Sequence, residues 1–249
     1  MRNLDSAWAK LDRANKHLAD MRNELGNYES LNPCEFVRED DPVLIKYRIS
    51  ILEPSSTIPA MLGDYVHNLR SALDHTAYAL ARKPTRQTYF PIFEDRQQAL
   101  LKRRDPITRR RRRRFNITVN TMPRDAIKIL RAIQPYQRGK AAKGDILWLV
   151  HELDIADKHR HMTLLAYPQK INLPPPLTGI MYGRGFKDGE EISLHLDAAR
   201  LLPNEPKFYV PITLAVEIEK GLPILPLPTL QSLYDYIRDD VIPQFARFF

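Results

Sequence analysis

The chain has 249 residues, 43% of them hydrophobic, which fits one large domain or a core domain with an appended lobe and excludes a disordered tail. No apolar run approaches the roughly 20 residues of a membrane span, the charged N-terminus does not resemble a signal peptide, and the single cysteine excludes an internal disulfide and a cysteine-based zinc site. The net charge of +8 is local, because nine of the 38 Lys and Arg residues but only one of the 30 Asp and Glu residues lie between Leu101 and Phe115. We therefore expect a cytoplasmic protein with no membrane contact and one basic segment on an otherwise neutral chain.

The N-terminal part of the chain predicts a mostly helical core. Apolar residues recur at steps of three and four, which predicts helices over residues 4–25, 63–82, 124–133 and 145–166. Asp5 and Ser6 are candidate caps of the first helix. The turn signal Asp40-Asp41-Pro42 separates two apolar runs, 36–38 and 43–52, and predicts a β-hairpin. Residues 89–93 predict a short extended segment.

Proline changes the character of the C-terminal part. Eleven of the 20 prolines fall between Pro168 and Pro243, which favours edge strands and rigid loops over a helical bundle. Strands are predicted at 180–182, 192–196 and 208–218, and a terminal helix from 228 or 229 to 237. The predicted fold is α+β, a helical core over residues 1–167 with a small, mainly antiparallel sheet, and a proline-rich, β-containing part over residues 168–249 packed on it.

The predicted helix 63–82 has an unusual polar side. An ordinary solvated helix face is rich in Lys and Glu, yet neither occurs between Asp64 and Ala81. The polar side instead carries His67, Asn68, Arg70, Ser71, Asp74 and His75. All of these side chains make directed hydrogen bonds, so the face is built to meet either another polar surface of the protein or a substrate.

Arg70 and His75 are separated by four residues, and this spacing resembles the R-x(4–6)-H signature of the HEPN superfamily of helical domains, many of which are ribonucleases. The resemblance implies metal-independent cleavage of RNA, in which the 2′-hydroxyl attacks its own phosphate. Arg70 would bind phosphate, His75 would act as acid and base, and Asp74 or His67 would orient the site, with Asn68 and Ser71 beside them. In the superfamily such residues commonly converge across a dimer axis, which predicts a homodimer.

Four motifs in order strengthen the resemblance. Gly63–His75 (GDYVHNLRSALDH), Phe90–Phe93 (FPIF), a segment ending in Gln-Pro-Tyr at Tyr136, and Leu153–Arg160 (LDIADKHR) are similar to a family of uncharacterised bacterial proteins. The likeness covers the chain from Leu4 to about Met162. The arginine-rich segment, between the second and third motifs, is a departure from that pattern.

The segment from Trp148 to Met162 carries a second polar group. Asp157 is expected beside the apolar stripe of this helix, where a carboxylate needs a partner, and Arg70 or His67 is the expected one. Lys158 and His159 are expected to support the site. A purely structural Asp–Arg or Asp–His tie between two core helices is the alternative.

The basic segment is predicted to be a loop over residues 101–115 that contacts nucleic-acid backbone, or else a solvated surface loop. Its basic residues are Lys102, Arg103, Arg104, Arg109, Arg110, Arg111, Arg112, Arg113 and Arg114.

The sequence therefore predicts an RNA-cleaving or RNA-binding, HEPN-like protein without cofactor or metal. Two alternatives stay open. One is a non-enzymatic dimeric module of a bacterial two-component system, with a protein partner such as an antitoxin. The other is a metal-dependent hydrolase that uses the histidines and aspartates, although neither histidine pair has the spacing of two ligands on one helix face.

Overall fold

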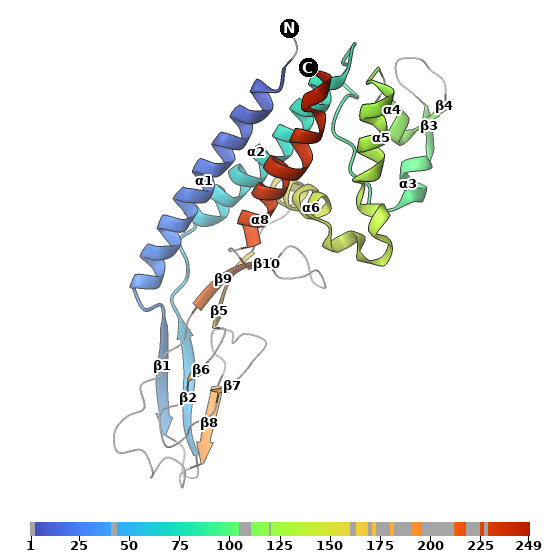
Figure 1. The fold of residues 1–249 in the computed structure, drawn as a ribbon. Helices are drawn as coiled ribbons and strands as arrows, with labels where there is room; N and C mark the ends of the chain where they lie inside the picture. The colour runs from blue at the N-terminus through green and yellow to red at the C-terminus, as the bar shows by residue number, and fades with distance from the viewer. Residues whose placement is uncertain are drawn as a thin grey trace. The chain divides into compact units, whose positions relative to one another are not determined.

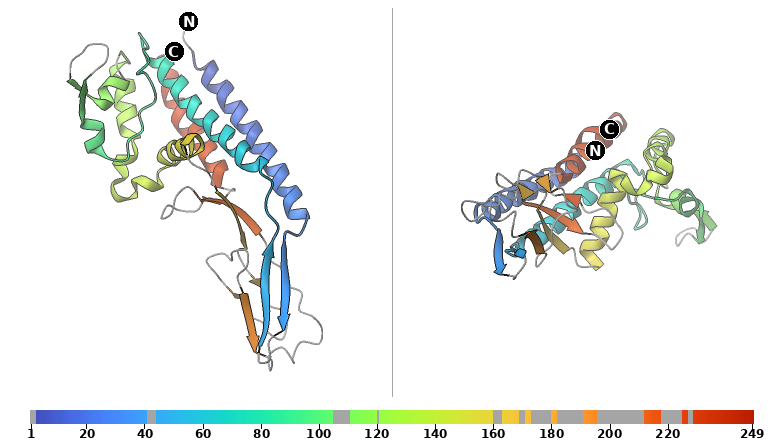
Figure 2. Two further views of the ribbon diagram at one scale, coloured as in Figure 1. Left: turned by 180° about the vertical axis from the view of Figure 1, so that it is seen from behind. Right: turned by 90° about the horizontal axis from the view of Figure 1, so that it is seen from below.

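The structure is a computed structural model that describes residues 3–40, 44–104, 111–119, 121–159, 163–168, 171–172, 180–181, 191–195, 212–217, 225–226 and 229–249. Its helices and small antiparallel sheets give it α+β architecture, as predicted. The chain divides into two compact units (Figures 1 and 2). The helical unit comprises Met1–Asp20, Ala60–His161 and Pro228–Phe249, and the strand-rich unit Met21–Pro59 and Met162–Leu227.

The predicted boundary lay between residues 167 and 168, and the observed division differs from it. The hairpin belongs to the strand-rich unit because its second strand pairs with a strand from the proline-rich part. The terminal helix belongs to the helical unit, where the hydroxyl of Tyr65 donates a hydrogen bond to the carbonyl of Leu230. Hydrogen bonding between distant segments, which local periodicity does not report, sets the boundaries.

The helical unit is built around α2 (Thr57–Leu80). Leu62, Leu69 and Leu73 on α2 are fully buried. In Figures 1 and 2, α1 (Asp5–Ser30) and the C-terminal helical segment run alongside α2. Packing on such a long apolar side explains why α2 extends beyond the predicted start at Gly63.

The C-terminal helical segment is longer than predicted. It consists of α8 (Thr229–Asp235), a π-helical turn η2 (Tyr236–Val241) and a 3₁₀ segment η3 (Ile242–Phe248). Pro243 stands near the start of η3, where a missing N–H costs little, so the chain continues past Ile237. Phe245 of η3 is fully buried and makes an edge-to-face contact with Phe90, with ring centroids 6.3 Å apart.

The remaining elements of the helical unit are short apart from α6. They are α3 (Arg96–Leu100), β3 (Lys102–Arg104), β4 (Arg111–Arg113), α4 (Arg114–Thr118), α5 (Arg124–Ala132), η1 (Pro135–Gly144) and α6 (Ile146–His159). The predicted helix 124–133 is confirmed as α5. The predicted helix 145–166 ends at His159, and a strand begins four residues later. An apolar run such as Leu164-Leu165-Ala166 suits either structure, and pairing with a distant strand decides it.

The strand-rich unit confirms the predicted hairpin. β1 (Cys34–Asp40) pairs antiparallel with β2 (Leu44–Ile51), and Tyr47 and Ile49 are buried. β8 (Glu191–His195) pairs with the other edge of β2. A second antiparallel sheet has the order β10-β9-β5, and a two-stranded ribbon joins β6 to β7.

The bounds of these remaining strands are β5 (Thr163–Pro168), β6 (Ile171–Asn172), β7 (Ile180–Met181), β9 (Ile212–Glu217) and β10 (Leu225–Pro226). The three strands predicted in the proline-rich part correspond to β7, β8 and β9, and β9 lies within the third predicted range, 208–218. None of the helices in the described part of the chain is long and apolar enough to cross a membrane.

Candidate functional site

Arg70 fixes the segment that follows α2 instead of pointing to solvent. Its Nη2 donates to the carbonyl oxygen of Phe90 at 2.8 Å and lies 3.0 Å from Oδ1 of Asp74, one helical turn later. The same carboxylate oxygen accepts the backbone N–H of Phe90 at 2.9 Å. Phe90 lies outside any helix or sheet, so α2 supplies the partners that its backbone needs. We call Arg70, Asp74 and the Phe90 backbone the Arg70 clamp.

The clamp buries the guanidinium. The Arg70 side chain is 9% exposed, and its Nη1 has no hydrogen-bond partner among the described residues. Burial raises the pKa of Asp74, against the opposing effects of the Arg70 charge and the Phe90 N–H. The Asp74 side chain remains 36% exposed. Asp74 is therefore a carboxyl group that takes up a proton more readily than an ordinary aspartate and that still reaches solvent.

A second group of polar side chains lies between α2 and α6. Asp154, which is buried, has its Oδ1 3.3 Å from Nδ1 of His67 and accepts a hydrogen bond from Nζ of Lys158 at 2.6 Å. The Oγ of Ser71 lies 3.4 Å from the other ring nitrogen of His67. We call His67, Asp154 and Lys158 the α6 cluster. The α6 cluster links α2 to α6. The His67 imidazole and the Lys158 ammonium group remain partly exposed to solvent.

The aspartate of this cluster is not the predicted one. Asp157 is exposed, and its carboxylate lies against Gly63 of α2. Asp154 lies one helical turn after the fully buried Val150, so it faces the interior and takes the partner expected for Asp157. The α6 cluster holds His67 and Lys158. Within the described residues, Arg70 bonds to Asp74 and the Phe90 carbonyl and not to either aspartate of α6.

His151, one turn before Asp154 on α6, is a neutral imidazole in the fold. Burial, reinforced by the positive charge of Arg70, lowers the pKa of His151 to about 4. Its Nδ1 is buried and has no partner within the described part of the chain. From the sequence, His151 was a candidate only as one of the histidines of the metal-dependent alternative, although its spacing from Asp154 and Lys158 places all three on one side of α6.

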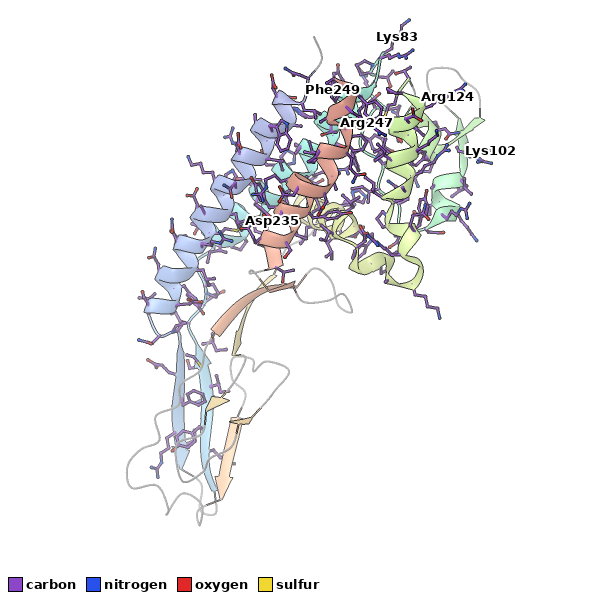
Figure 3. The ribbon with its side chains drawn as sticks, in the orientation of Figure 1. Lys83, Lys102, Arg124, Asp235, Arg247 and Phe249 are labelled. Atoms are coloured by element: carbon purple, nitrogen blue, oxygen red, sulfur yellow. The ribbon has the colours of Figure 1, made fainter. Side chains whose placement is uncertain are left out.

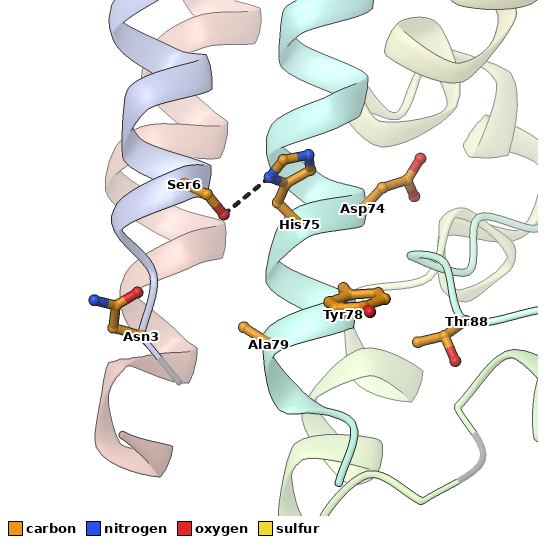
Figure 4. A pocket seen from close by; sticks show the side chains of 7 residues that line it. All are labelled: Asn3, Ser6, Asp74, His75, Tyr78, Ala79 and Thr88. Carbon is orange, nitrogen blue, oxygen red and sulfur yellow. Dashed lines mark hydrogen bonds between the residues drawn. The ribbon is translucent and has the colours of Figure 1, made fainter. Parts of the chain in front are cut away.

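His75 lies on a different side of α2 and lines a hollow of about 480 Å³. Nδ1 of His75 is 2.9 Å from Oγ of Ser6 on α1. Figure 4 shows the His75 ring directed toward Ser6, with the Asp74 carboxylate on the opposite side and Tyr78 one turn along the helix. We call this the His75 hollow; its lining residues are Asn3, Ser6, Asp74, His75, Tyr78, Ala79 and Thr88.

The hollow brings together groups that sequence reasoning separated. Ser6 was predicted to be a helix cap, but the first turn of α1 is instead capped by Asn3, whose Oδ1 accepts the N–H of Asp5. Tyr78 and Thr88 were not predicted to take part. The signal for Tyr78 was present, since an aromatic ring on the polar side of a helix, here 57% exposed, is a common binding feature.

Arg70 and His75 do not converge within one chain. Residues five apart on a helix are separated by about 140°. Arg70 consequently meets the Phe90 segment while His75 meets α1. Their convergence across a dimer axis stays a prediction.

Another predicted site residue, Asn68, has different surroundings. Asn68 is buried and donates its side-chain amide to the carbonyl of Asp64 at 2.7 Å, a bond within α2. The side chain of His159 lies outside the described residues, as do Arg109 and Arg110.

Near the C-terminal end of α2 there is a second hollow, of about 540 Å³, which we call the basic hollow. Its lining is Arg82, Lys83, Thr121, Met122, Pro123 and Arg124. The backbone there is held by hydrogen bonds from the N–H of Lys83 to Oγ1 of Thr121 and from the N–H of Arg82 to the carbonyl of Thr121. Lys83 and Arg124 are labelled in Figure 3.

The basic segment is not simply a loop. β3 and β4 form an antiparallel pair in which Lys102, Arg103 and Arg104 lie opposite Arg113, Arg112 and Arg111. We call this pair the basic ribbon. The backbone N–H of Arg114 donates to the carbonyl of Leu101 at 2.9 Å and closes its base.

The described residues include no group of three or more His, Cys, Asp or Glu side chains arranged to hold a metal ion. Comparisons of the chain with protein-family models, with curated proteins and with solved structures found no match.

Proposed function

We propose that this protein binds RNA and cleaves it without a metal ion, and that the His75 hollow is its active site. The observation that carries the proposal is the meeting of two acid–base groups, Asp74 and His75, in one hollow that is open to solvent. Cleavage of RNA by its own 2′-hydroxyl needs one group that accepts a proton and one that donates it. A raised carboxyl pKa brings Asp74 closer to working pH, as an acid–base group requires.

The proposed step is a transphosphorylation. The Asp74 carboxylate takes the proton of the 2′-hydroxyl while the 2′-oxygen forms a bond to phosphorus. The bond from phosphorus to the 5′-oxygen breaks, and the protonated imidazole of His75 gives its proton to that oxygen. The products are a 2′,3′-cyclic phosphate and a free 5′-hydroxyl. The Tyr78 hydroxyl and the Asn3 amide are hydrogen-bond donors at the same hollow for the phosphate oxygens.

In this proposal Arg70 is a positioning residue. Its guanidinium holds one oxygen of the Asp74 carboxylate and is itself held by the Phe90 carbonyl. Such a clamp fixes the direction of Asp74 and lets a charged carboxylate persist beside a partly buried site. The R-x(4)-H spacing thus acts through Asp74, which lies between the two residues in sequence.

Positive charge for the RNA backbone is available next to the hollow. Ala79 lines the His75 hollow and Arg82, three residues further along, lines the basic hollow. Arg82, Lys83 and Arg124 at the basic hollow suit contacts to phosphates adjacent to the scissile one, which position a nucleic acid without reading its sequence.

The test is incubation of the purified protein with a single-stranded RNA, an identical DNA and an RNA with one 2′-deoxy position, all in EDTA. We expect cleavage of the RNA to products that end in a 2′,3′-cyclic phosphate, and none of the DNA or at the deoxy position. His75→Ala should lower the rate by about 10²–10⁴-fold, the usual contribution of a general acid or base. His17→Ala, which removes a half-buried histidine of α1, is the matched control and should keep the rate.

Cleavage that His75→Ala leaves unchanged would overturn the proposal, as would products with a 3′-hydroxyl. Asp74→Asn adds a second check. It keeps the hydrogen bond from the Phe90 N–H but removes both the proton acceptor and the counter-charge of Arg70, so it should lose activity and still unfold cooperatively, at a lower midpoint.

A second candidate is the non-enzymatic dimeric module of a two-component system. The observation that favours it is the Arg70 clamp, because a buried, bonded arginine explains the motif as a structural device. In that case the protein is inactive on RNA and Arg70→Ala breaks its oligomer. Sedimentation would give the oligomeric state of the original protein and of Arg70→Ala. Together with the cleavage assay, it distinguishes the enzyme from the dimeric module.

A further inference from the structure

The basic ribbon places like charges opposite one another. The register pairs Lys102 with Arg113, Arg103 with Arg112 and Arg104 with Arg111. Every cross-strand pair therefore joins two cations, and the six paired positions contain no acidic residue. Like charges directly opposite in an antiparallel pair are destabilising.

Among the described residues, the contacts outside the strand pairing lie at the base of the ribbon. A two-stranded pair alone is marginally stable in water. Its base is anchored, because the Arg114 guanidinium carbon lies 5.4 Å from the centre of the Phe93 ring and Phe115 of α4 is buried. Beyond the anchor, Lys102 (labelled in Figure 3) and Arg113 are exposed. Neither of these two side chains has an ion-pair partner among the described residues, so phosphates from outside the chain would supply the counter-charge.

We propose that the basic ribbon binds a double-helical nucleic acid, whose phosphates supply that counter-charge and complete the ribbon's folding. The choice of RNA as the first probe rests on the proposed function, but the ribbon's binding does not. A duplex provides phosphates on both sides of a groove. The major groove of a DNA duplex admits an antiparallel two-stranded ribbon, and an RNA stem is recognised through its phosphates and 2′-hydroxyls. Phosphate neutralisation by clustered Lys and Arg also gives tight binding without base contacts.

A single strand fits the ribbon less well. Proteins that hold single strands combine positive charge with aromatic rings on which the bases stack. The sequence from Lys102 to Arg114 has no aromatic residue. The chemistry of the ribbon is therefore that of a backbone-binding element for a helical stem.

The experiment uses the full chain carrying His75→Ala, so that no RNA is consumed. Fluorescence anisotropy would measure its binding to an RNA hairpin stem, a DNA duplex of the same length, and an unstructured single strand with the same number of phosphates. Stronger binding of at least one double helix than of the single strand supports the proposal, and the tighter of the two helices identifies the kind of duplex. Equal or weaker binding of both duplexes overturns it.

Arg103→Glu gives the sharper test, because it changes one like-charge pair into an ion pair. We expect slower hydrogen exchange of the ribbon amides in the free protein and, at the same time, duplex binding weakened by about tenfold or more. The slope of log affinity against log salt should fall by about two, since Arg103 is lost and Arg112 is neutralised. Lys16→Glu on α1, exposed and with the same change of charge, is the control and should alter neither quantity.

If Arg103→Glu disrupts folding, the His75→Ala protein itself gives the answer. Hydrogen exchange of residues 101–114 should slow when the stem is added, and exchange that the stem leaves unchanged contradicts coupled folding. Failure here is distinguishable from failure of the proposed function. A protein that cleaves RNA but binds stems independently of Arg103 disproves only the ribbon proposal, whereas one that binds stems through the ribbon but does not cleave disproves only the enzymatic proposal.

Discussion

The two sides of α2 use similar polar residues for different purposes. On one side, Arg70 is buried and bonded to Asp74 and to the Phe90 backbone. On the other, His75 bonds to Ser6 and lines a solvent-open hollow. The difference shows that two residues of one short motif on a helix can lie in different environments, one buried and one open to solvent. Asp74, which contacts Arg70 and also lines the hollow, is the link between them.

Loss of Arg70 should have the largest effect on the buried side. Arg70→Met leaves the Asp74 carboxylate and the Phe90 carbonyl without their cation, which should lower the free energy of unfolding by about 3 kcal/mol in urea denaturation. Arg86→Met, at an exposed arginine, should change it by less than about 0.5 kcal/mol. A stable Arg70→Met protein that has lost activity would instead place Arg70 among the substrate-binding groups.

The second-largest effect is expected at low pH, where the neutral, buried His151 should lower the stability of the folded state. The folded state keeps His151 neutral with a pKa of about 4, below its ordinary value of 6.5, so its stabilising contribution is complete above pH 6.5 and is lost as the pH falls toward 4. The shift corresponds to about 3 kcal/mol across that window. His151→Leu should make the free energy of unfolding less dependent on pH there. The same substitution at His17 should keep the wild-type dependence, and an equal slope in His151→Leu would refute the assignment.

The close approach of α2 and α6 should show as coupling between Gly63 and Asp157. A Cβ added at Gly63 would lie 2.7 Å from the carboxyl carbon of Asp157, so Gly63→Ala must displace that side chain. In an Asp157→Ala background the same change should stabilise the protein by about 1 kcal/mol, because alanine is the better helix former. A double-mutant cycle should therefore give a coupling energy of about 1–2 kcal/mol. Additive effects would mean that the carboxylate moves away freely.

The smallest change in the free energy of unfolding is expected at the His75 hollow. Ser6→Ala removes the hydrogen bond to His75 and should lower the free energy of unfolding by about 0.5 kcal/mol. Cleavage should persist, whereas His75→Ala abolishes it. A loss of stability as large as that of Arg70→Met would show that the His75 side is structural too, and the contrast between the two sides would disappear.

Local patterns predicted much of the fold. Periodicity gave the cores of α1, α2 and α5, and alternation around Asp41-Pro42 gave the hairpin. The predicted end of the helix 145–166 was wrong, because residues 163–168 form a strand that pairs with β9, almost 50 residues away in the sequence. The prediction of a loop over residues 101–115 was wrong in part for a different reason, because β3 and β4 pair although the residues opposite one another carry like charges.

The candidate site shows the same division. The angles between Arg70, Asp74 and His75 around α2 follow from the residue order alone, because the period of a helix sets them. Three other features depend on contacts between distant segments: Phe90 docks on Arg70, α1 brings Ser6 to His75, and Asp154 rather than Asp157 turns inward. The angles within a helix are set locally. The groups that each polar face meets are set by the segments that bury the apolar side of the helix, and those segments come from distant parts of the chain.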